Sequence, residues 1–85
     1  MYKNRAKDGW NNIAGKKIRS FRMKLPGNVS QNRLAAMLQI EGIDLDKNAI
    51  QRIECGKRFV TDIELRGFAK VLGVSYSDLL DDEIE

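Results

Sequence analysis

The 85-residue sequence predicts a single all-α domain of five short helices. Apolar residues recur at the spacing of one helix face along the chain, and no stretch alternates apolar and polar residues as a half-buried strand does. Serine, threonine, asparagine or aspartate precedes these stretches, and glycine or proline follows them, as is typical of helix ends. Because each helix is too short to be stable alone, the apolar faces are expected to share one core.

The first helix is predicted over residues 12–25, with Asn11 or Asn12 as its N-cap. Its buried face is expected to hold the residues at i, i+4, i+7 and i+11, namely Ala14, Ile18, Phe21 and Leu25. The opposite face is basic and carries Lys16, Lys17, Arg19 and Lys24. Pro26 ends this helix, because proline disfavours a helical conformation in the residue before it.

The second helix is predicted over residues 31–40, with Ser30 as its N-cap. Its buried stripe is Leu34, Ala35 and Leu38, with Met37 at the margin. The stretch 40–45 has no clear periodicity and contains a glycine, so it predicts a turn. Ile43 and Leu45 are the apolar anchors expected within that turn.

The third helix, predicted over residues 47–55, has two very different faces. Asp46 is its expected N-cap and Gly56 its expected stop. Ala49, Ile50 and Ile53 fall on one side, and the other side carries Lys47, Asn48, Gln51, Arg52 and Cys55. Lysine, arginine and carboxamide side chains pair with guanine and adenine edges or with phosphate oxygens. A polar surface without a partner is the alternative interpretation of this outward face.

Two further helices are predicted from capping patterns. Thr61 and Glu64 have the spacing of a capping box, and the helix that follows buries Leu65, Phe68, Ala69 and Leu72 before Gly73 ends it. Ser75 and Asp78 repeat the capping pattern. The short fifth helix after them is expected to bury Leu79 and Leu80.

Charge is distributed unevenly along the chain. Residues 1–35 hold nine basic and one acidic residue (+8), and residues 36–85 hold six basic and eleven acidic residues (−5), which sum to the net charge of +3. Such asymmetry indicates one side that faces a polyanion.

The chain is expected to divide into an arm, a folded domain and a tail. Residues 1–11 are expected to form a flexible basic arm, and a frayed terminus is favoured over an arm that contacts DNA. Trp10 is expected to be the first residue packed on the domain. The folded domain is expected over 12–80, before an acidic tail, 81–85.

Several classes of function are disfavoured by composition. The single cysteine, Cys55, has no partner for an internal disulfide, and without histidine no usual zinc site is expected. No nucleophile and base are placed together, so we expect neither an enzyme nor a cofactor, and no small-molecule ligand is evident. Cys55 is interpreted as a surface thiol. No apolar run reaches the length of a membrane span and no signal segment is evident, so a cytoplasmic protein without membrane contact is expected.

Four segments stand out along the chain: Ile18 to Arg22, Ser30 to Leu38, Ile50 to Arg58, and Leu72 to Ser75 followed by Leu79 and Leu80. In this order they resemble the phage repressor and Cro-type helix-turn-helix family, the XRE family of transcriptional regulators. Each motif alone is weakly specific, but together they cover residues 13–80 at nearly the family's spacing. The resemblance implies a compact five-helix lambda-repressor-like domain whose second and third helices form the helix-turn-helix.

The resemblance also implies roles for individual residues. The third helix would lie in the major groove of double-stranded DNA, with base contacts from Lys47, Asn48, Arg52 and Gln51. Phosphate contacts are expected from Gln31, at the start of the second helix, and from Lys57 and Arg58 in the loop after the third. Arg22 and Glu54 match a pair that bridges the first helix to the end of the third.

One departure from the family lies in the turn of the helix-turn-helix. Asp46 follows Leu38 by eight residues, whereas the family usually has about three residues from the position of Leu38 to the cap. Either a longer second helix or a bulged loop would accommodate the difference, and the angle of the third helix depends on which is present.

The function expected from these features is that of a sequence-specific DNA-binding transcriptional regulator. We expect a repressor that acts as a homodimer on a palindromic site, with Leu79 and Leu80 of the fifth helix as a candidate interface. The alternative is an antitoxin or another helix-turn-helix module that binds protein. Such a module would be indicated by an exposed apolar patch on the outward face of the third helix.

Overall fold

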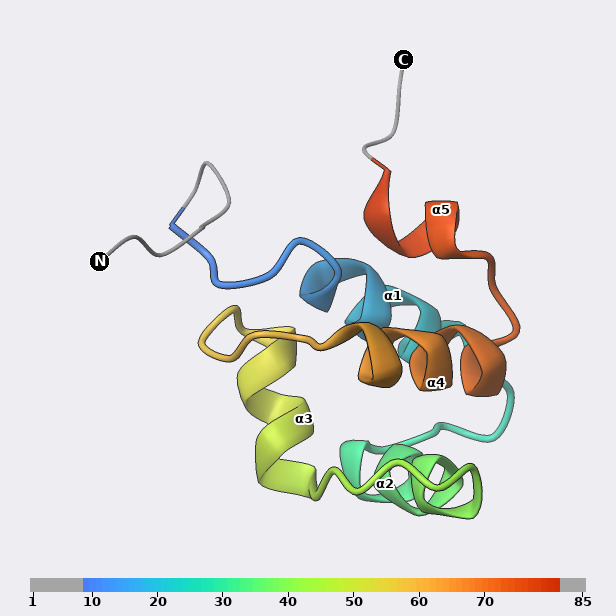
Figure 1. Ribbon diagram of the computed structural model, residues 1–85. Helices are drawn as coiled ribbons and strands as arrows, with labels where there is room; N and C mark the ends of the chain where they lie inside the picture. The colour runs from blue at the N-terminus through green and yellow to red at the C-terminus, as the bar shows by residue number, and fades with distance from the viewer. Residues whose placement is uncertain (1–8, 82–85) are drawn as a thin grey trace.

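The computed structural model describes residues 9–81, which form five α-helices and no strand (Figure 1). In chain order these are α1 (Gly15–Lys24), α2 (Gln31–Ile40), α3 (Lys47–Glu54), α4 (Asp62–Leu72) and α5 (Tyr76–Leu80). The prediction of an all-α chain is confirmed for this part. No helix within residues 9–81 is long and apolar enough to cross a membrane.

The helices are arranged around one apolar core. α1 and α4 lie side by side, α2 packs against α4, α3 packs against α1, and α2 and α3 pack against each other (Figure 1). α5 packs against α1 and α4. Every helix contributes at least one fully buried side chain, and the largest of these are Ile18, Leu34, Leu38, Ile50, Ile53, Phe68 and Leu79. α3 lies at one edge of the molecule, so only part of its surface enters the core.

Four helices begin with the side-chain caps that the sequence predicts. In each, the capping oxygen accepts a hydrogen bond from the backbone N–H three residues later, at 2.8 to 3.1 Å. The capping residues are Ser30, Asp46, Thr61 and Ser75, and the last two form complete capping boxes with Glu64 and Asp78. These bonds satisfy backbone donors that a helix leaves free in its first turn.

The first helix starts later than predicted, at Gly15 instead of residue 12. Asn12 does bond to the start of the helix, since its Oδ1 accepts from the Gly15 N–H at 2.7 Å. Its side-chain nitrogen, however, donates to the carbonyl oxygens of Ile53 and Arg58. This tertiary bonding holds Asn12 outside the helix. The other end is as expected, because Leu25 before the proline has an extended backbone.

The long connection between α2 and α3 is a turn and not an extension of α2. Gly42 has a φ of +83°, and the Ile43 N–H donates back to the Leu38 carbonyl at 2.9 Å, which closes α2 with a Schellman motif. Ile43 packs against Gly67 of α4, where a Cβ would overlap the Ile43 side chain. Leu45 is buried. The two predicted anchors therefore tie the additional residues to the core.

The expectation that Leu79 and Leu80 are both buried is wrong for Leu80. Leu79 is fully buried, whereas Leu80 is 37 % exposed. Consecutive residues point about 100° apart around a helix, and α5 has only five residues that pack on α1 and α4 from one side. The buried position of Leu79 also removes it from any surface that a partner could contact.

Candidate nucleic-acid interface

α3 separates buried and exposed residues as the sequence predicts. Ala49, Ile50, Ile53 and Glu54 are buried. The four predicted base-contacting residues are all exposed, and we call them the reading face: Lys47, Asn48, Gln51 and Arg52. Within residues 9–81 none of these four side chains forms a hydrogen bond or ion pair with a neighbour. Their polar groups are thus available to an external partner.

The position of α3 is fixed by an ion pair at its last turn. Arg22 of α1 donates from Nε to Oε2 of Glu54 at 2.8 Å and from Nη2 to Oε1 at 2.9 Å. The two side chains are only 12 % and 3 % exposed. The hydrogen bonds to Glu54 raise the pKa of Arg22 above its ordinary value, although burial acts in the opposite direction. The pair implied by the family resemblance is therefore present, and it is largely shielded from water.

Two further groups complete this network. The side-chain nitrogen of Gln31, the first residue of α2, donates to Glu54 Oε1 at 2.9 Å. Arg22 also donates from Nη1 to the Val29 carbonyl at 2.9 Å. The network thus joins α1, the start of α2 and the end of α3. The predicted phosphate contact of Gln31 stays a prediction, and it would have to use the groups of its amide that do not bind Glu54.

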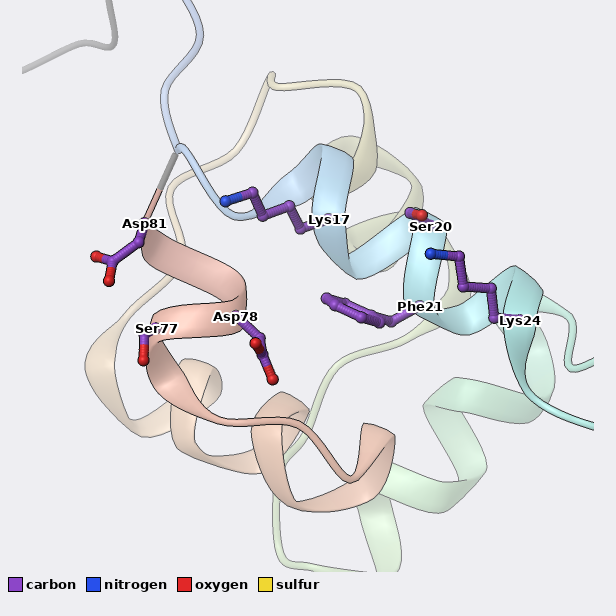
Figure 2. Close-up of a pocket in the computed structure, with 7 residues that line it drawn as sticks. All are labelled: Lys17, Ser20, Phe21, Lys24, Ser77, Asp78 and Asp81. Carbon is purple, nitrogen blue, oxygen red and sulfur yellow. The ribbon is translucent and has the colours of Figure 1, made fainter. Parts of the chain in front are cut away.

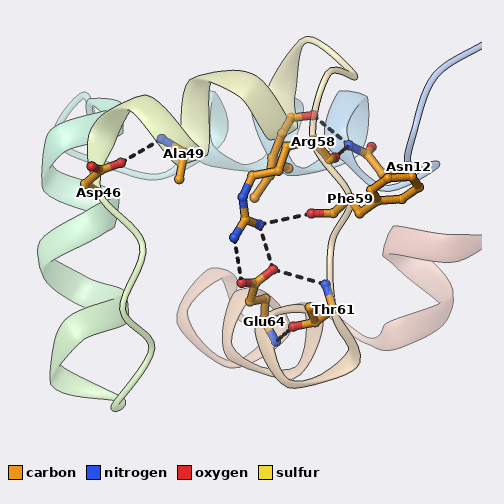
Figure 3. A network of polar contacts seen from close by, with 8 residues as sticks. Asn12, Asp46, Ala49, Arg58, Phe59, Thr61 and Glu64 are labelled. Atoms are coloured by element: carbon orange, nitrogen blue, oxygen red, sulfur yellow. Dashed lines mark hydrogen bonds and ion pairs between the residues drawn. The ribbon is translucent and has the colours of Figure 1, made fainter.

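Of the two predicted phosphate-binding residues after α3, only Lys57 is exposed without a side-chain partner in residues 9–81. Arg58 is half-buried and pairs with Glu64 through two bonds of 2.9 and 3.1 Å, and it also donates to the Phe59 carbonyl at 3.0 Å (Figure 3). Its guanidinium joins the loop to α4, and the predicted phosphate contact of Arg58 stays a prediction that would use the donors left over from these bonds. The capping box of α4 brings the Glu64 carboxylate within reach.

The Glu64 carboxylate is held in its charged form by these bonds. Burial raises the pKa of Glu64, but hydrogen bonds from the Arg58 guanidinium and the Thr61 backbone N–H outweigh that effect. The net result is a pKa below the ordinary glutamate value of 4.5. The contact between the loop and the start of α4 is therefore strongest while Glu64 is ionised.

A contact that the sequence does not predict joins the chain before α1 to the end of α3. The Asn11 backbone N–H donates to the Gly56 carbonyl at 2.9 Å, and the Asn11 side-chain nitrogen donates to the Lys57 carbonyl at 3.1 Å. The Trp10 ring packs on Gly56, where a Cβ would overlap it. Trp10 is thus attached to the domain, as expected. Residues 1–8 of the predicted arm, and 82–85 of the predicted tail, lie outside the described residues.

Two shallow grooves lie near these elements. One, between α1 and α5, has a volume of about 280 Å³ and is lined by Lys17, Ser20, Phe21, Lys24, Ser77, Asp78 and Asp81 (Figure 2). The other, of about 260 Å³, lies between α2 and the start of α3 and includes Asn32, Gln39, Asp44 and Lys47. Within residues 9–81 no cluster of His, Cys, Asp and Glu could hold a metal ion. Exposed Lys47 places the second groove next to the reading face.

The chain matches no protein-family model, no curated protein and no solved structure. Its candidate site consists of an exposed polar helix face, a buried network that fixes this helix, and the exposed lysine in the loop that follows.

Glu54→Ala is expected to lower the free energy of unfolding by about 3 kcal/mol, because it leaves the shielded Arg22 guanidinium without its counter-charge. Urea denaturation followed by circular dichroism measures this change. Glu41→Ala is the matched control, since Glu41 pairs with Lys70 at 2.8 Å but the lysine side chain is 71 % exposed. The control should lose less than about 0.5 kcal/mol. Equal losses in the two variants would contradict a supporting role for the buried pair.

Acid is expected to weaken the loop contact through Glu64. Because the pKa of this carboxyl is lowered on folding, its stabilising contribution is complete above the ordinary value of 4.5 and is lost as the pH falls through the lower folded value. Glu64→Gln should therefore flatten the dependence of stability on pH below 4.5, and not above it. Thermal denaturation of both proteins over an acidic pH series measures this. Parallel pH profiles would count against the assignment.

Proposed function

We propose that this chain is a sequence-specific DNA-binding transcriptional regulator of the Cro and phage repressor type, with a lambda-repressor-like fold. In this proposal α2 and α3 are the helix-turn-helix, and α3 enters the major groove. The observation that carries the proposal is the reading face, Lys47, Asn48, Gln51 and Arg52, exposed and unbonded within residues 9–81 on a helix whose other face is buried. A polar face on a fixed helix suits base recognition, since the backbone positions that carry its donors are set before DNA binds.

The chemistry of the reading face suits purine edges in particular. Asn48 and Gln51 each offer an NH2 donor group beside a carbonyl acceptor, the pattern that pairs with N7 and N6 of adenine. Lys47 and Arg52 offer only donors, which match O6 and N7 of guanine or phosphate oxygens. Lys57, just beyond the end of α3, would contact phosphate. This interface requires no cofactor, and we expect the protein to act in the cytoplasm, where the resemblance favours repression.

The alternative, an antitoxin or protein-interaction module, would be favoured by apolar side chains on the reading face. The exposed large apolar side chains of residues 9–81 are Ile13, Met23, Ile40, Phe59, Ile63, Tyr76 and Leu80. None of them belongs to α3. Protein partners are normally met by apolar or aromatic anchors at the centre of an interface, so the composition of this face supports DNA over a protein partner.

A homodimer is proposed because a single helix of eight residues can contact only a few base pairs. Twofold pairing would double the readout at half-sites about one helical turn apart. Of the two leucines considered for the interface, Leu80 alone is exposed. Sedimentation analysis of the purified protein, free and with its selected DNA site, should give a dimer in at least the bound state. A monomer in both would contradict the proposal.

The proposed base recognition is tested by two alanine variants, one of which should change sequence specificity and the other only the overall affinity for DNA. Selection from random duplex DNA first identifies a preferred site. Asn48→Ala should then weaken binding to that site by about 1–3 kcal/mol and relax the choice at one base pair. Lys57→Ala should weaken binding to all sequences alike and reduce the slope of log K against log salt by about one.

Fluorescence anisotropy over a salt series measures both effects. If Asn48→Ala weakens random DNA and the preferred site equally, α3 does not read bases as proposed. If the unmodified protein binds no duplex DNA, the protein-interaction alternative becomes the better explanation of the reading face.

A further inference from the structure

The backbone around Lys57 is held on both sides by one residue that is distant in sequence. The Asn11 backbone N–H donates to the Gly56 carbonyl at 2.9 Å, and its side-chain nitrogen donates to the Lys57 carbonyl at 3.1 Å. These carbonyls belong to the two peptide planes that flank the Lys57 Cα. The same two planes are also held from α3, since the Lys57 and Arg58 N–H groups both donate to the Arg52 carbonyl, at 2.8 and 3.3 Å. Asn11 and Arg52 together therefore set the direction of the Lys57 Cα–Cβ bond.

Neighbouring contacts show that this arrangement is built into the packing. The Lys57 N–H donates to the Arg52 carbonyl at 2.8 Å, and the Asn12 side chain donates to the Arg58 carbonyl at 2.7 Å. Two glycines permit the close approach, because a Cβ on Gly15 would overlap the Ile53 carbonyl and a Cβ on Gly56 would overlap the Trp10 ring. Residues 10–12 therefore form a clasp over the end of α3 and the loop that carries Lys57.

We propose that Asn11 is a positioning residue for DNA binding, which acts by directing the Lys57 ammonium toward the phosphate backbone. This inference rests on the proposed function. A lysine on a loop that is free to rotate would lose more conformational freedom on meeting a phosphate than a lysine whose backbone is already set. In this role Asn11 acts through Lys57 and need not contact DNA.

Replacing Asn11 by alanine isolates this role with little effect on folding. The variant loses an exposed hydrogen bond to the Lys57 carbonyl. It also removes the buried Asn11 Oδ1, which has no hydrogen-bond partner among residues 9–81. An unsatisfied buried acceptor is unfavourable, so its removal offsets part of the lost bond. The backbone bond from Asn11 to Gly56 is kept, because alanine retains the N–H donor.

A double-mutant cycle tests the inference on the full chain. Asn11→Ala, Lys57→Ala and the double variant are titrated with random-sequence duplex DNA over a series of KCl concentrations. Asn11→Ala is expected to weaken binding about two- to fourfold, with a smaller salt slope, in the unmodified background. In the Lys57→Ala background the same change should have almost no effect, since the group that Asn11 directs is absent.

Lys47 provides the matched control, because it lies at the opposite end of α3 from the clasp. In the Lys47→Ala background, Asn11→Ala should keep its full effect on binding. The positioning role would be overturned if Asn11→Ala had equal effects in the Lys57→Ala and Lys47→Ala backgrounds, or no effect in any background. In that case DNA binding by the unmodified protein would still support the proposed function. Absence of DNA binding by the unmodified protein would overturn both.

Discussion

The buried ion pair between Arg22 and Glu54 is the contact on which the position of α3 depends. A carboxylate in the last turn of a helix is unfavourable, because the helix dipole is negative at that end. The structure compensates with the Arg22 guanidinium and with the Gln31 amide, both within 2.9 Å of Glu54 oxygens. α3 has only eight residues and would not be stable alone. Its orientation is therefore set by where α1 and α2 present their polar groups to its C-terminal end.

A second set of bonds acts on the same end of α3 from another direction. Asn12 links the start of α1 to Ile53 and to the loop, and the Arg58–Glu64 pair ties that loop to α4 (Figure 3). Both ends of α3 are thus constrained, since Asp46 caps the other one. The side chains of the reading face, which lies between these points, have no such internal bonds within residues 9–81. The bonds that hold α3 in place thus lie at its two ends, and the polar side chains of the reading face point outward.

Local features of the fold could be read from the sequence because their causes lie within a few residues. Capping depends on pairs three residues apart, and all four predicted side-chain caps are present. Burial along α3 follows from helix periodicity alone, so the exposure of Asn48 and Arg52 was predictable. The late start of α1 was not, because the Asn12 amide bonds to carbonyls 41 and 46 residues away. No periodic pattern encodes such a pairing.

The partners of long polar side chains were the least predictable part of the site. The Glu64 carboxylate, whose capping role is predicted from spacing, also binds the Arg58 guanidinium, and nothing in the spacing indicates this second contact. The bond from the Gln31 amide to Glu54 is likewise absent from the sequence-based expectations. Spacing places such residues on a surface, but which charge they meet depends on how helices pack. The family resemblance supplied the Arg22–Glu54 pair, which spacing alone would not.

Trp10 can serve as an intrinsic fluorescence probe because of where it lies. It is the only tryptophan in the chain, its ring lies on Gly56 at the end of α3, and the Lys16 ammonium is 4.6 Å from the ring centroid. Indole emission responds to nearby charge and to water. Fluorescence from this one residue therefore reports on the end of α3, so that loosening of that end can be followed separately from unfolding of the helices detected by circular dichroism.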